Sequence, residues 1–318
     1  MYDITVLGEL LIDFTYHSQS GHGSGGNALF EQNAGGAVAN VAALCAGFGL
    51  KTAFLGKIGK DMHGDFLRGV LEGKGVDTSG LISDDKFFTT LAFVKLDGAE
   101  RSFSFARKPG ADTQISPGEL KTDILKNTKI FHFGSLSLTD EPAREATHEA
   151  IKTSKAAGAI CSYDPNYRAS LWPNEEAAKI QMRSLIEFAD VMKISDEEAE
   201  LLTGYADSSA ALSFLLDKGV KVAVLTRGEA GSMAAIKDGA VIASAAKCNP
   251  VDTTGAGDAF WGAFLYCLLK SKRKPEDVSL DELGNFLEFS NAAAALCVEG
   301  RGAIPALPSL DAVLDKLD

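Results

Sequence analysis

The amino-acid sequence predicts an α/β fold: a three-layer sandwich in which helices cover both faces of a mainly parallel central sheet. Short apolar runs of strand type alternate with longer amphipathic runs of helix type along most of the 318 residues, as in a series of βαβ units. With 46% apolar and 23% charged residues, the chain has the composition of an ordinary globular protein. Because no linker, internal repeat or low-complexity tract interrupts the pattern, residues 1–318 are expected to form a single domain.

The predicted elements begin with an apolar strand over residues 3–7. A helix of small residues, closed by glycine, is predicted over 36–47, a strand over 51–57 and a helix over 65–74. Further strands are predicted over residues 129–133, 159–163, 191–194 and 220–226. Sheets of this kind bind ligands just beyond the carboxyl ends of their strands, so functional residues are expected there.

Two segments interrupt the alternation and predict a small β lid. Residues 12–26 are polar, rich in Gly and Ser, and too long for an ordinary connection between a strand and a helix. Residues 88–105 alternate in polarity on either side of Asp97 and Gly98, as expected for a β-hairpin. Strands inserted at the ligand end of a sheet can cover the site, and the alternative is a surface hairpin without a function. The lid is expected to comprise residues 12–34 and 88–108.

Charge and composition exclude several classes of partner. A formal net charge of −12 argues against the electrostatic attraction on which nonspecific nucleic-acid binding depends. The longest apolar run, residues 259–269, has 11 residues, whereas a membrane-spanning helix needs about 20. Asp3 stands where a signal peptide carries positive charge, and the 5 cysteines are widely spaced. A reducing cytoplasm is therefore the expected location.

The most specific motif is VDTTGAGDAF at residues 251–260. Gly255 and Gly257 allow a tight turn that exposes backbone N–H groups at the start of a helix, and such groups bind anions. Asp258 stands at the same turn, where the helix dipole favours its ionised form, so that it can accept a hydroxyl proton. Phosphoryl transfer to an alcohol needs both an anion site and such a base. The alternative is a glycine turn in which Asp258 only caps the helix.

A second glycine-containing loop, LTRGEAG at residues 225–231, follows an apolar strand. Thr226, Gly228 and Gly231 suit a loop that wraps nucleotide phosphates, although similar strings also form ordinary turns. The chain contains no GxxxxGK[ST] motif, and no GxGxxG opens its first βα unit. Neither a Walker A site nor a dinucleotide-dependent oxidoreductase is therefore expected.

Polar residues near the N-terminal strands predict a site for a polyhydroxylated ligand. Asp13 follows the string VLGELLI, and the string NAGGAVAN spans residues 33–40. Gly35 and Gly36 permit close approach of the backbone, while Asp13 and Asn40 can hydrogen-bond sugar hydroxyls. Asp13 could instead cap a turn or helix. Asn40 stands among alanines, where a buried amide needs partners.

Together these motifs resemble the ribokinase/PfkB family of sugar kinases. The resemblance runs from VLGELLIDF through NAGGAVANVAALCAGFG and GKIGKDMHGDFL to VDTTGAGDAFWGAFL, over essentially the whole chain. The strings FHFGSLSLTDEPAR, SYDPNYRASLW and VMKISDEEAELLTG are most similar to bacterial and plant fructokinases. The resemblance implies a ribokinase-like fold with ATP and Mg²⁺ as cofactors, and it leaves K⁺ open as a further one.

The resemblance also implies roles for individual residues. Asp258 matches the general base of the family, and Gly255, Ala256 and Gly257 match its anion hole. The implied sugar-site positions are Asp13, Gly35, Gly36, Asn40, Arg107 and Arg168. The implied nucleotide-site positions are Lys193, Thr226, Gly228, Gly231 and Asn291. Asp252 and Thr254 match positions that help to hold a monovalent cation.

The assignments of the two arginines and of the Mg²⁺ ligand have open alternatives. Arg107 and Arg168, placed near the sugar or the transferred phosphate, could be solvated surface residues. The family's NxxE pattern near the Mg²⁺–phosphate site reads SDEE at residues 195–198, so only Glu198 is carried over as a Mg²⁺ ligand. Ser195 followed by Glu198 is also the pattern of a helix capping box.

The sequence therefore predicts an ATP-dependent sugar kinase that transfers the γ-phosphoryl group to a primary hydroxyl, O6 of D-fructose. Ribose, 2-keto-3-deoxygluconate or a nucleoside are alternative substrates. A catalytically silent sugar-binding or regulatory relative is the alternative from another class, and the intact Asp258 and glycine pair argue against it. Pairing of exposed lid strands between two copies, giving a homodimer, is left open.

Overall fold

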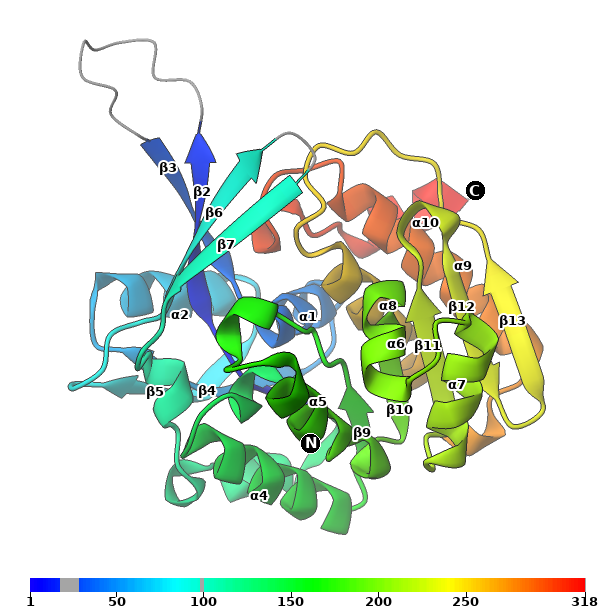
Figure 1. Ribbon diagram of the computed structural model, residues 1–318, viewed down its shortest axis with the longest axis horizontal. Coiled ribbons are helices and arrows are strands. Elements are labelled where there is room, and N and C mark those ends of the chain that lie inside the picture. Colours follow the sequence, from blue (N-terminus) through cyan, green and yellow to red (C-terminus); the bar gives the residue numbers. More distant parts are fainter. Residues whose placement is uncertain (18–28, 98–99, 318) are drawn as a thin grey trace.

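The computed structural model describes residues 1–17, 29–97 and 100–317. Within them it contains a large central sheet with helices on both faces and a smaller, separate sheet that projects from the body (Figure 1). Gly98, in the predicted hairpin turn, and residues 18–28 of the predicted lid lie outside the described residues. No helix in the described part of the chain is both long enough and apolar enough to cross a bilayer.

The central sheet is mainly parallel, as predicted. Its strands are β1 (Tyr2–Leu7), β4 (Thr52–Gly59), β5 (Asp77–Asp84), β8 (Thr128–Phe133), β9 (Ile160–Tyr163), β10 (Val191–Ser195), β11 (Val222–Thr226), β12 (Ser232–Ile236) and β13 (Gly239–Ala243). Their order is β13-β12-β11-β10-β9-β8-β1-β4-β5. The strands from β11 to β5 pair in parallel, and β12 and β13 add an antiparallel end.

Each of the predicted strands is present, but β5, β12 and β13 were not predicted. β12 has the sequence SMAAI, whose alanines favour helices over strands, and it forms a strand because it is buried against β11. β13 ends the sheet and is mostly exposed, so it lacks the apolar signal of an inner strand. β5 ends the opposite side of the sheet and mixes polar and apolar residues.

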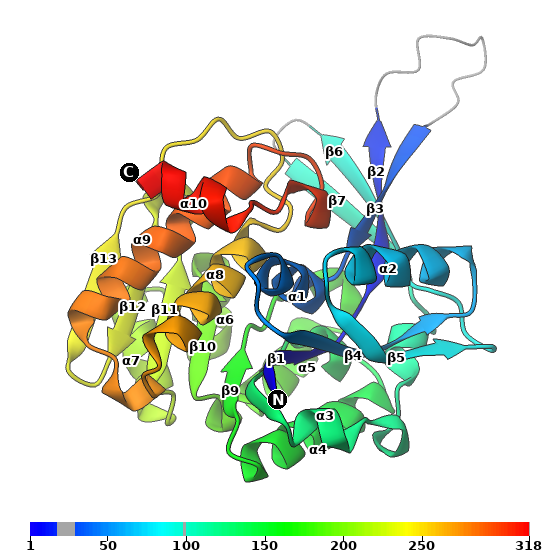
Figure 2. The same cartoon turned by 180° about the vertical axis from the view of Figure 1, so that it is seen from behind.

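Two hydrophobic cores lie on the two faces of the sheet, because side chains alternate along each strand. On β11, Val222 and Val224 face one core, whereas Ala223 and Leu225 face the other. The helices that contribute to the first core are α1 (Ala37–Gly47), α2 (Met62–Gly73), α8 (Ala256–Ser271) and α9 (Leu280–Cys297). Those of the second are α3 (Thr122–Leu125), α4 (Ala143–Ala156), α5 (Glu175–Arg183), α6 (Asp196–Thr203) and α7 (Ser208–Asp217). α10 (Leu310–Leu317) packs on α9, as Figure 2 shows.

The smaller sheet consists of β2 (Leu11–His17), β3 (Leu29–Gly35), β6 (Leu91–Asp97) and β7 (Glu100–Ala106), in the order β3-β2-β6-β7. β6 and β7 form the predicted hairpin. The sequence presents residues 12–26 as a polar insertion, but their first part is a strand that pairs with β3 on one side and β6 on the other. Both inserted segments therefore build one small sheet, which Figure 1 shows standing above the body.

Candidate active site

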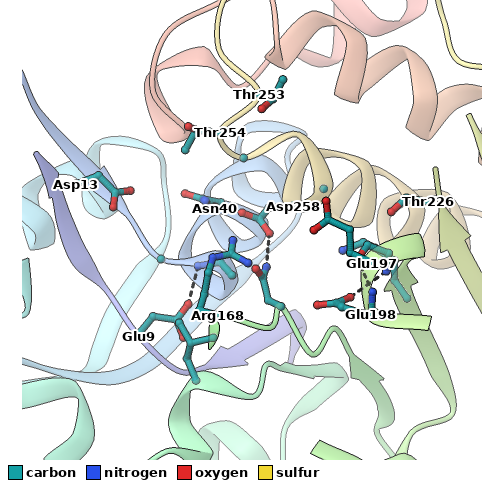
Figure 3. Close-up of a pocket in the computed structure, with 18 of the residues that line it drawn as sticks. Glu9, Asp13, Asn40, Arg168, Glu197, Glu198, Thr226, Thr253, Thr254 and Asp258 are labelled. Carbon is teal, nitrogen blue, oxygen red and sulfur yellow. Dashed lines mark hydrogen bonds between the residues drawn. The ribbon is translucent and has the colours of Figure 1, made fainter. Parts of the chain in front are cut away.

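A cavity of about 360 Å³ lies where helix α8 begins, and most of the predicted site residues line it. Figure 3 shows Asp258 between Asp13 on one side and Thr226 on the other. The predicted residues in the lining are Asp13, Gly36, Asn40, Arg168, Lys193, Glu198, Thr226, Gly228, Thr254, Gly255, Gly257 and Asp258. Those outside the lining are Gly35, Arg107, Gly231, Asp252, Ala256 and Asn291.

Asp258 lies in the first turn of α8, which begins after Gly255. Gly255 has φ 80°, and a Cβ atom there would lie 2.9 Å from Cβ of Ala303, so the turn requires glycine. The Asp258 side chain is buried, and each carboxylate oxygen accepts a hydrogen bond from an amide. Nδ2 of Asn40 donates to Oδ2 at 2.7 Å, and Nδ2 of Asn166 donates to Oδ1 at 2.9 Å. The carboxylate is thus held from two sides.

Burial raises the pKa of Asp258 to about 6, and the nearby carboxylate of Asp164 adds to the rise. The hydrogen bond from Asn40 and the positive charges of Lys193 and Arg168 act in the opposite direction. From the sequence, the helix dipole alone predicts that Asp258 is ionised. In the folded chain, burial outweighs that effect, yet a pKa of about 6 still leaves most of the carboxylate ionised at pH 7. A base poised close to neutral pH suits proton transfer.

The opposite side of the cavity carries the groups predicted to bind a polyol. Asp13 comes from β2, and burial raises its pKa to about 7 while the charge of Arg168 lowers it. A Cβ atom at Gly35 would lie 2.0 Å from Oδ2 of Asp13, so only glycine leaves room for this carboxylate. Gly36 has φ 118°, and a Cβ there would lie 2.4 Å from the carbonyl oxygen of Glu9. The two glycines therefore allow the close backbone approach that the motif predicts.

Two further cavity residues, Glu9 and Asn166, were not singled out from the sequence. Glu9 is 2% exposed, and its Oε1 accepts a hydrogen bond from the N–H of Ala37 at the start of α1. Asn166 donates a hydrogen bond to the carboxylate of Asp258. Both residues follow the carboxyl end of a predicted strand, over residues 3–7 and 159–163. That position is where ligand-binding residues of parallel sheets occur, and it was the available signal.

Lys193 and Asp164 form a buried ion pair beside the glycine turn that precedes Asp258. Nζ of Lys193 lies 2.5 Å from Oδ2 of Asp164, with the two side chains only 5% and 2% exposed. Burial favours the neutral amine, but the surrounding carboxylates outweigh it and raise the pKa of Lys193. A Cβ atom at Gly257 would lie 3.3 Å from Nζ of Lys193. A fixed positive charge therefore lies directly against the glycine turn.

Glu198 is engaged with backbone groups. Its Oε1 accepts from the N–H of Tyr167 at 2.7 Å, and its Oε2 accepts from the N–H of Ser195 at 2.9 Å. Ser195 and Glu198 form the capping box of α6, the alternative that the sequence also allowed. Asp196 and Glu197 line the same side of the cavity. Within the described residues, no group of three or more His, Cys, Asp or Glu side chains is arranged to hold a metal ion.

The loop after β11 contributes Thr226 and Gly228 to the cavity, but Gly231 has another role. It has φ 86°, and a Cβ there would lie 2.2 Å from the carbonyl oxygen of Ala243. Asn291 is buried nearby, where Nδ2 donates to the carbonyl of Ser244 at 3.0 Å and Oδ1 accepts from the hydroxyl of Ser232 at 3.1 Å. Asn291 thus fixes the chain that follows β13.

Arg107 is buried rather than solvated, and it lines a separate cavity of about 700 Å³ at the base of the small sheet. Its guanidinium donates to Asp112, to the hydroxyl of Thr139 and to the carbonyl of Leu136. The structure therefore does not bring Arg107 into the cavity of Asp258. Arg168, in contrast, lines that cavity (Figure 3).

Asp252 lies just before the glycine turn and holds the local backbone. Its Oδ1 accepts from the N–H and the hydroxyl of Thr254, at 3.0 and 2.7 Å. Its Oδ2 accepts from the N–H of Gly302 at 3.0 Å. The carboxylate thus joins the VDTTGAGD turn to the loop that contains Gly302.

A buried carboxylate at a helix N-terminus shares one cavity with side chains suited to binding a polyol and with a glycine-containing loop, an arrangement typical of a small-molecule kinase. The chain belongs to the pfkB family of carbohydrate kinases, whose family model matches residues 1–310. It is 41% identical to probable fructokinase-7 of Arabidopsis thaliana over 318 aligned residues, which are 99% of this chain and 92% of that protein.

Solved structures agree with this assignment. The fructokinase of Xylella fastidiosa with bound ATP superposes with a TM-score of 0.92 at 33% identity, covering 100% of this chain and 98% of that one. A double mutant of the fructokinase of Vibrio cholerae O395, with fructose, ADP and potassium ion bound, gives a TM-score of 0.87 at 28% identity over 100% and 99% of the two chains. The ribokinase-like fold and the carbohydrate kinase activity expected from the sequence are confirmed.

Proposed function

We propose that this carbohydrate kinase is an ATP-dependent fructokinase, which transfers the γ-phosphoryl group of ATP to O6 of D-fructose. The identity to the plant fructokinase over nearly the whole chain supports the choice of sugar. The observation that carries the proposed chemistry is the position of Asp258, buried at the start of α8 with both oxygens held by amides. From there it can accept the proton of a hydroxyl placed in the cavity.

At the sugar end, Asp13, Asn40 and Arg168 supply hydrogen-bonding groups for the hydroxyls. Oδ1 of Asn40 is buried and has no hydrogen-bond partner among the described residues, so the hydroxyl of a bound sugar would supply the missing donor. Gly35 and Gly36 leave the space that Asp13 and the backbone occupy. A sugar lacking a hydroxyl at these groups would leave them unpaired, which is how such a site rejects wrong substrates.

At the phosphate end, the N–H groups of residues 255–258 would stabilise the transferring phosphoryl group together with the fixed charge of Lys193. Thr226 and Gly228 would contact the nucleotide, with Gly231 and Asn291 supporting their loop from behind. Mg²⁺ prefers carboxylates and phosphate oxygens, and Asp196, Glu197 and Glu198 supply carboxylates along one side of the cavity, where Mg²⁺ would be held mainly by the ATP phosphates. When bound, Mg²⁺ would neutralise charge on the ATP phosphates. We assign K⁺ or another monovalent cation to the loop that Asp252 and Thr254 fix.

The small sheet is proposed to act as a lid over the sugar and as the contact between two copies of the chain. A lid would exclude water, which otherwise competes as the phosphoryl acceptor. Three aromatic side chains of this sheet are between 36% and 44% exposed: Tyr16, Phe30 and Phe93. A second copy would cover such a patch, and sedimentation of Phe30→Ser beside the parent chain tests this dimer. A reducing cytoplasm, in which the cysteines remain thiols, is the proposed location.

The experiment that tests the proposed function is ATP turnover on a panel of acceptors, namely fructose, ribose, 2-keto-3-deoxygluconate and a nucleoside. We expect the highest kcat/KM with fructose and a product phosphorylated at O6, identified by NMR. A clear preference for another acceptor would change the substrate but leave the kinase in place. Binding of sugar without turnover of any acceptor would instead support the silent relative.

A further inference from the structure

Asn166 is one of the cavity residues for which the sequence motifs provide no role. It is 8% exposed, lies in the lining of the cavity and donates to Oδ1 of Asp258 at 2.9 Å. Its backbone φ is 51°, in the left-handed region that non-glycine residues seldom adopt. Among the described residues, Lys272 at φ 58° is the only other non-glycine residue with a positive φ.

The neighbouring backbone is held on both sides of Asn166. The carbonyl of Pro165 accepts hydrogen bonds from the N–H of Ser135, at 3.1 Å, and from its hydroxyl. The N–H of Tyr167 donates to Oε1 of the buried Glu198 at 2.7 Å. A strained conformation persists where the surrounding structure over-determines it, and such positions cluster at active sites. The fold therefore fixes the direction in which the Asn166 amide points.

The direction of the amide matters because a general base must present a free lone pair to the hydroxyl whose proton it takes. Asn40 reaches Asp258 from α1, and Asn166 reaches it from the segment after β9, so each carboxylate oxygen accepts from a different element. With one amide alone, the carboxylate could rotate about its Cβ–Cγ bond. With both, its plane is fixed relative to the cavity, and the reacting geometry is set in advance.

We propose that Asn166 is a positioning residue for Asp258, whose amide fixes the plane of the carboxylate so that it faces the acceptor hydroxyl. This inference rests on the proposed role of Asp258 as the base in sugar phosphorylation. The charged groups around Asp258 are Asp164, Lys193, Arg168 and Asp13. A hydrogen bond to the charged form also favours that form, so loss of the Asn166 amide should raise the pKa of the base.

Two variants of Asn166 test the proposal, with Lys272→Gly as a control in the same backbone conformation. Asn166→Gly removes the amide but suits a positive φ, and Asn166→Asp keeps the size while replacing the donor by a second carboxylate. For Asn166→Gly we expect kcat to fall about 10- to 100-fold, the effect of losing one hydrogen bond to a charged group, with the sugar KM changed by less than about threefold.

The pH dependence of kcat separates positioning from a purely structural role. In both variants the acidic limb should move to higher pH, further for Asn166→Asp because its carboxylate repels that of Asp258. The melting temperature of Asn166→Gly should stay within about 2–4 °C of the parent chain. Lys272→Gly, at the exposed end of α8, should change neither kcat nor the limb.

Parental kcat and an unmoved acidic limb in folded Asn166→Gly and Asn166→Asp would overturn the inference. It would equally be overturned if kcat fell only together with the melting temperature while the limb stayed in place. If the parent chain phosphorylates no sugar of the panel, the proposed function fails before the variants are compared, so the two failures can be told apart.

Discussion

Asn40 and Asp258 stand 218 positions apart in the sequence, and Nδ2 of one donates to Oδ2 of the other at 2.7 Å. The bond joins the first turns of α1 and α8, two helices that pack on the same face of the central sheet. It therefore connects the motif that predicts sugar binding, GGAVAN, with the motif that predicts binding of the transferred phosphoryl group, GAGD. The proposed base therefore lies where the two proposed sites meet.

Asp258→Asn should abolish most of the activity. An amide of the same size cannot take up the hydroxyl proton, and the loss of a general base lowers kcat by about 10²–10⁴-fold. The measurement is kcat with fructose and ATP, combined with circular dichroism to establish that the variant is folded. Near-parental turnover by a folded variant would remove Asp258 from the role of base.

Activity should fall in acid because the base must be ionised. With a pKa of about 6 for Asp258, kcat should decrease about tenfold per pH unit below pH 6. The contribution of the same group to folding stability changes with pH in the opposite direction. The folded-state pKa lies above the ordinary value of 3.8, so the folded state binds this proton more tightly and the group's contribution favours folding as pH falls from about 6 to 4. Urea denaturation at pH 5 and 7, beside the kcat profile, distinguishes titration of the base from unfolding.

Gly35→Ala should weaken sugar binding more than it affects folding. The new Cβ would lie 2.0 Å from Oδ2 of Asp13, and the Asp13 side chain can only avoid it by turning away from its present position. We expect the fructose KM to rise about tenfold or more, because losing a hydrogen bond to a charged group costs about that much binding affinity. Gly69→Ala is the matched control, since a Cβ there on α2 would meet open space. An unchanged KM in Gly35→Ala would contradict the sugar-binding role of Asp13.

Lys193→Met should destabilise the protein as well as inactivate it. The change leaves the carboxylate of Asp164 buried without its cation, which costs about 3–5 kcal/mol of unfolding free energy. The double variant with Asp164→Asn should recover part of that loss but not the activity, because the positive charge beside the anion hole stays absent. Urea denaturation measures the unfolding free energy of both variants.

The control for this prediction is the exposed pair of Lys60 and Asp85, with side chains 68% and 76% exposed. Lys60→Met should leave the unfolding transition unchanged, since solvent screens such pairs. If Lys193→Met and Lys60→Met lowered the unfolding free energy equally, burial of the Lys193–Asp164 pair would not determine how much that pair contributes to stability.

The sequence predicted those parts of the fold and site that depend on local patterns. Parallel strands, the small-residue helix and the glycine turn before Asp258 follow from hydrophobic period and from backbone geometry, which neighbouring residues determine. β12 was missed because its alanines become a strand only through burial against β11. Arg107 was expected near the sugar or the transferred phosphate, and its ion pair with Asp112 depends on a tertiary contact that residue type alone does not specify.

The contacts between site residues could likewise not be predicted from the sequence. That Asn166 meets Asp258 depends on β9 lying beside β8 and on α8 packing against β9, where Trp261 donates to the hydroxyl of Ser162. The pKa of about 6 for Asp258 likewise reflects burial and the carboxylate of Asp164, neither of which is written in the VDTTGAGDAF string. The string identified the residue, and the fold sets its acidity.

The strand that carries Asp13 is also the second strand of the small sheet, while Asn40 belongs to the body. Any displacement of that sheet relative to the body therefore changes the separation of two groups proposed to hold the same sugar. Occupancy of the site and the position of the sheet are then thermodynamically linked: a sugar that bridges the two groups restrains the sheet, and restraint of the sheet raises affinity for the sugar by the same factor. Contacts that another chain makes with the outer strands would act on sugar affinity through this linkage.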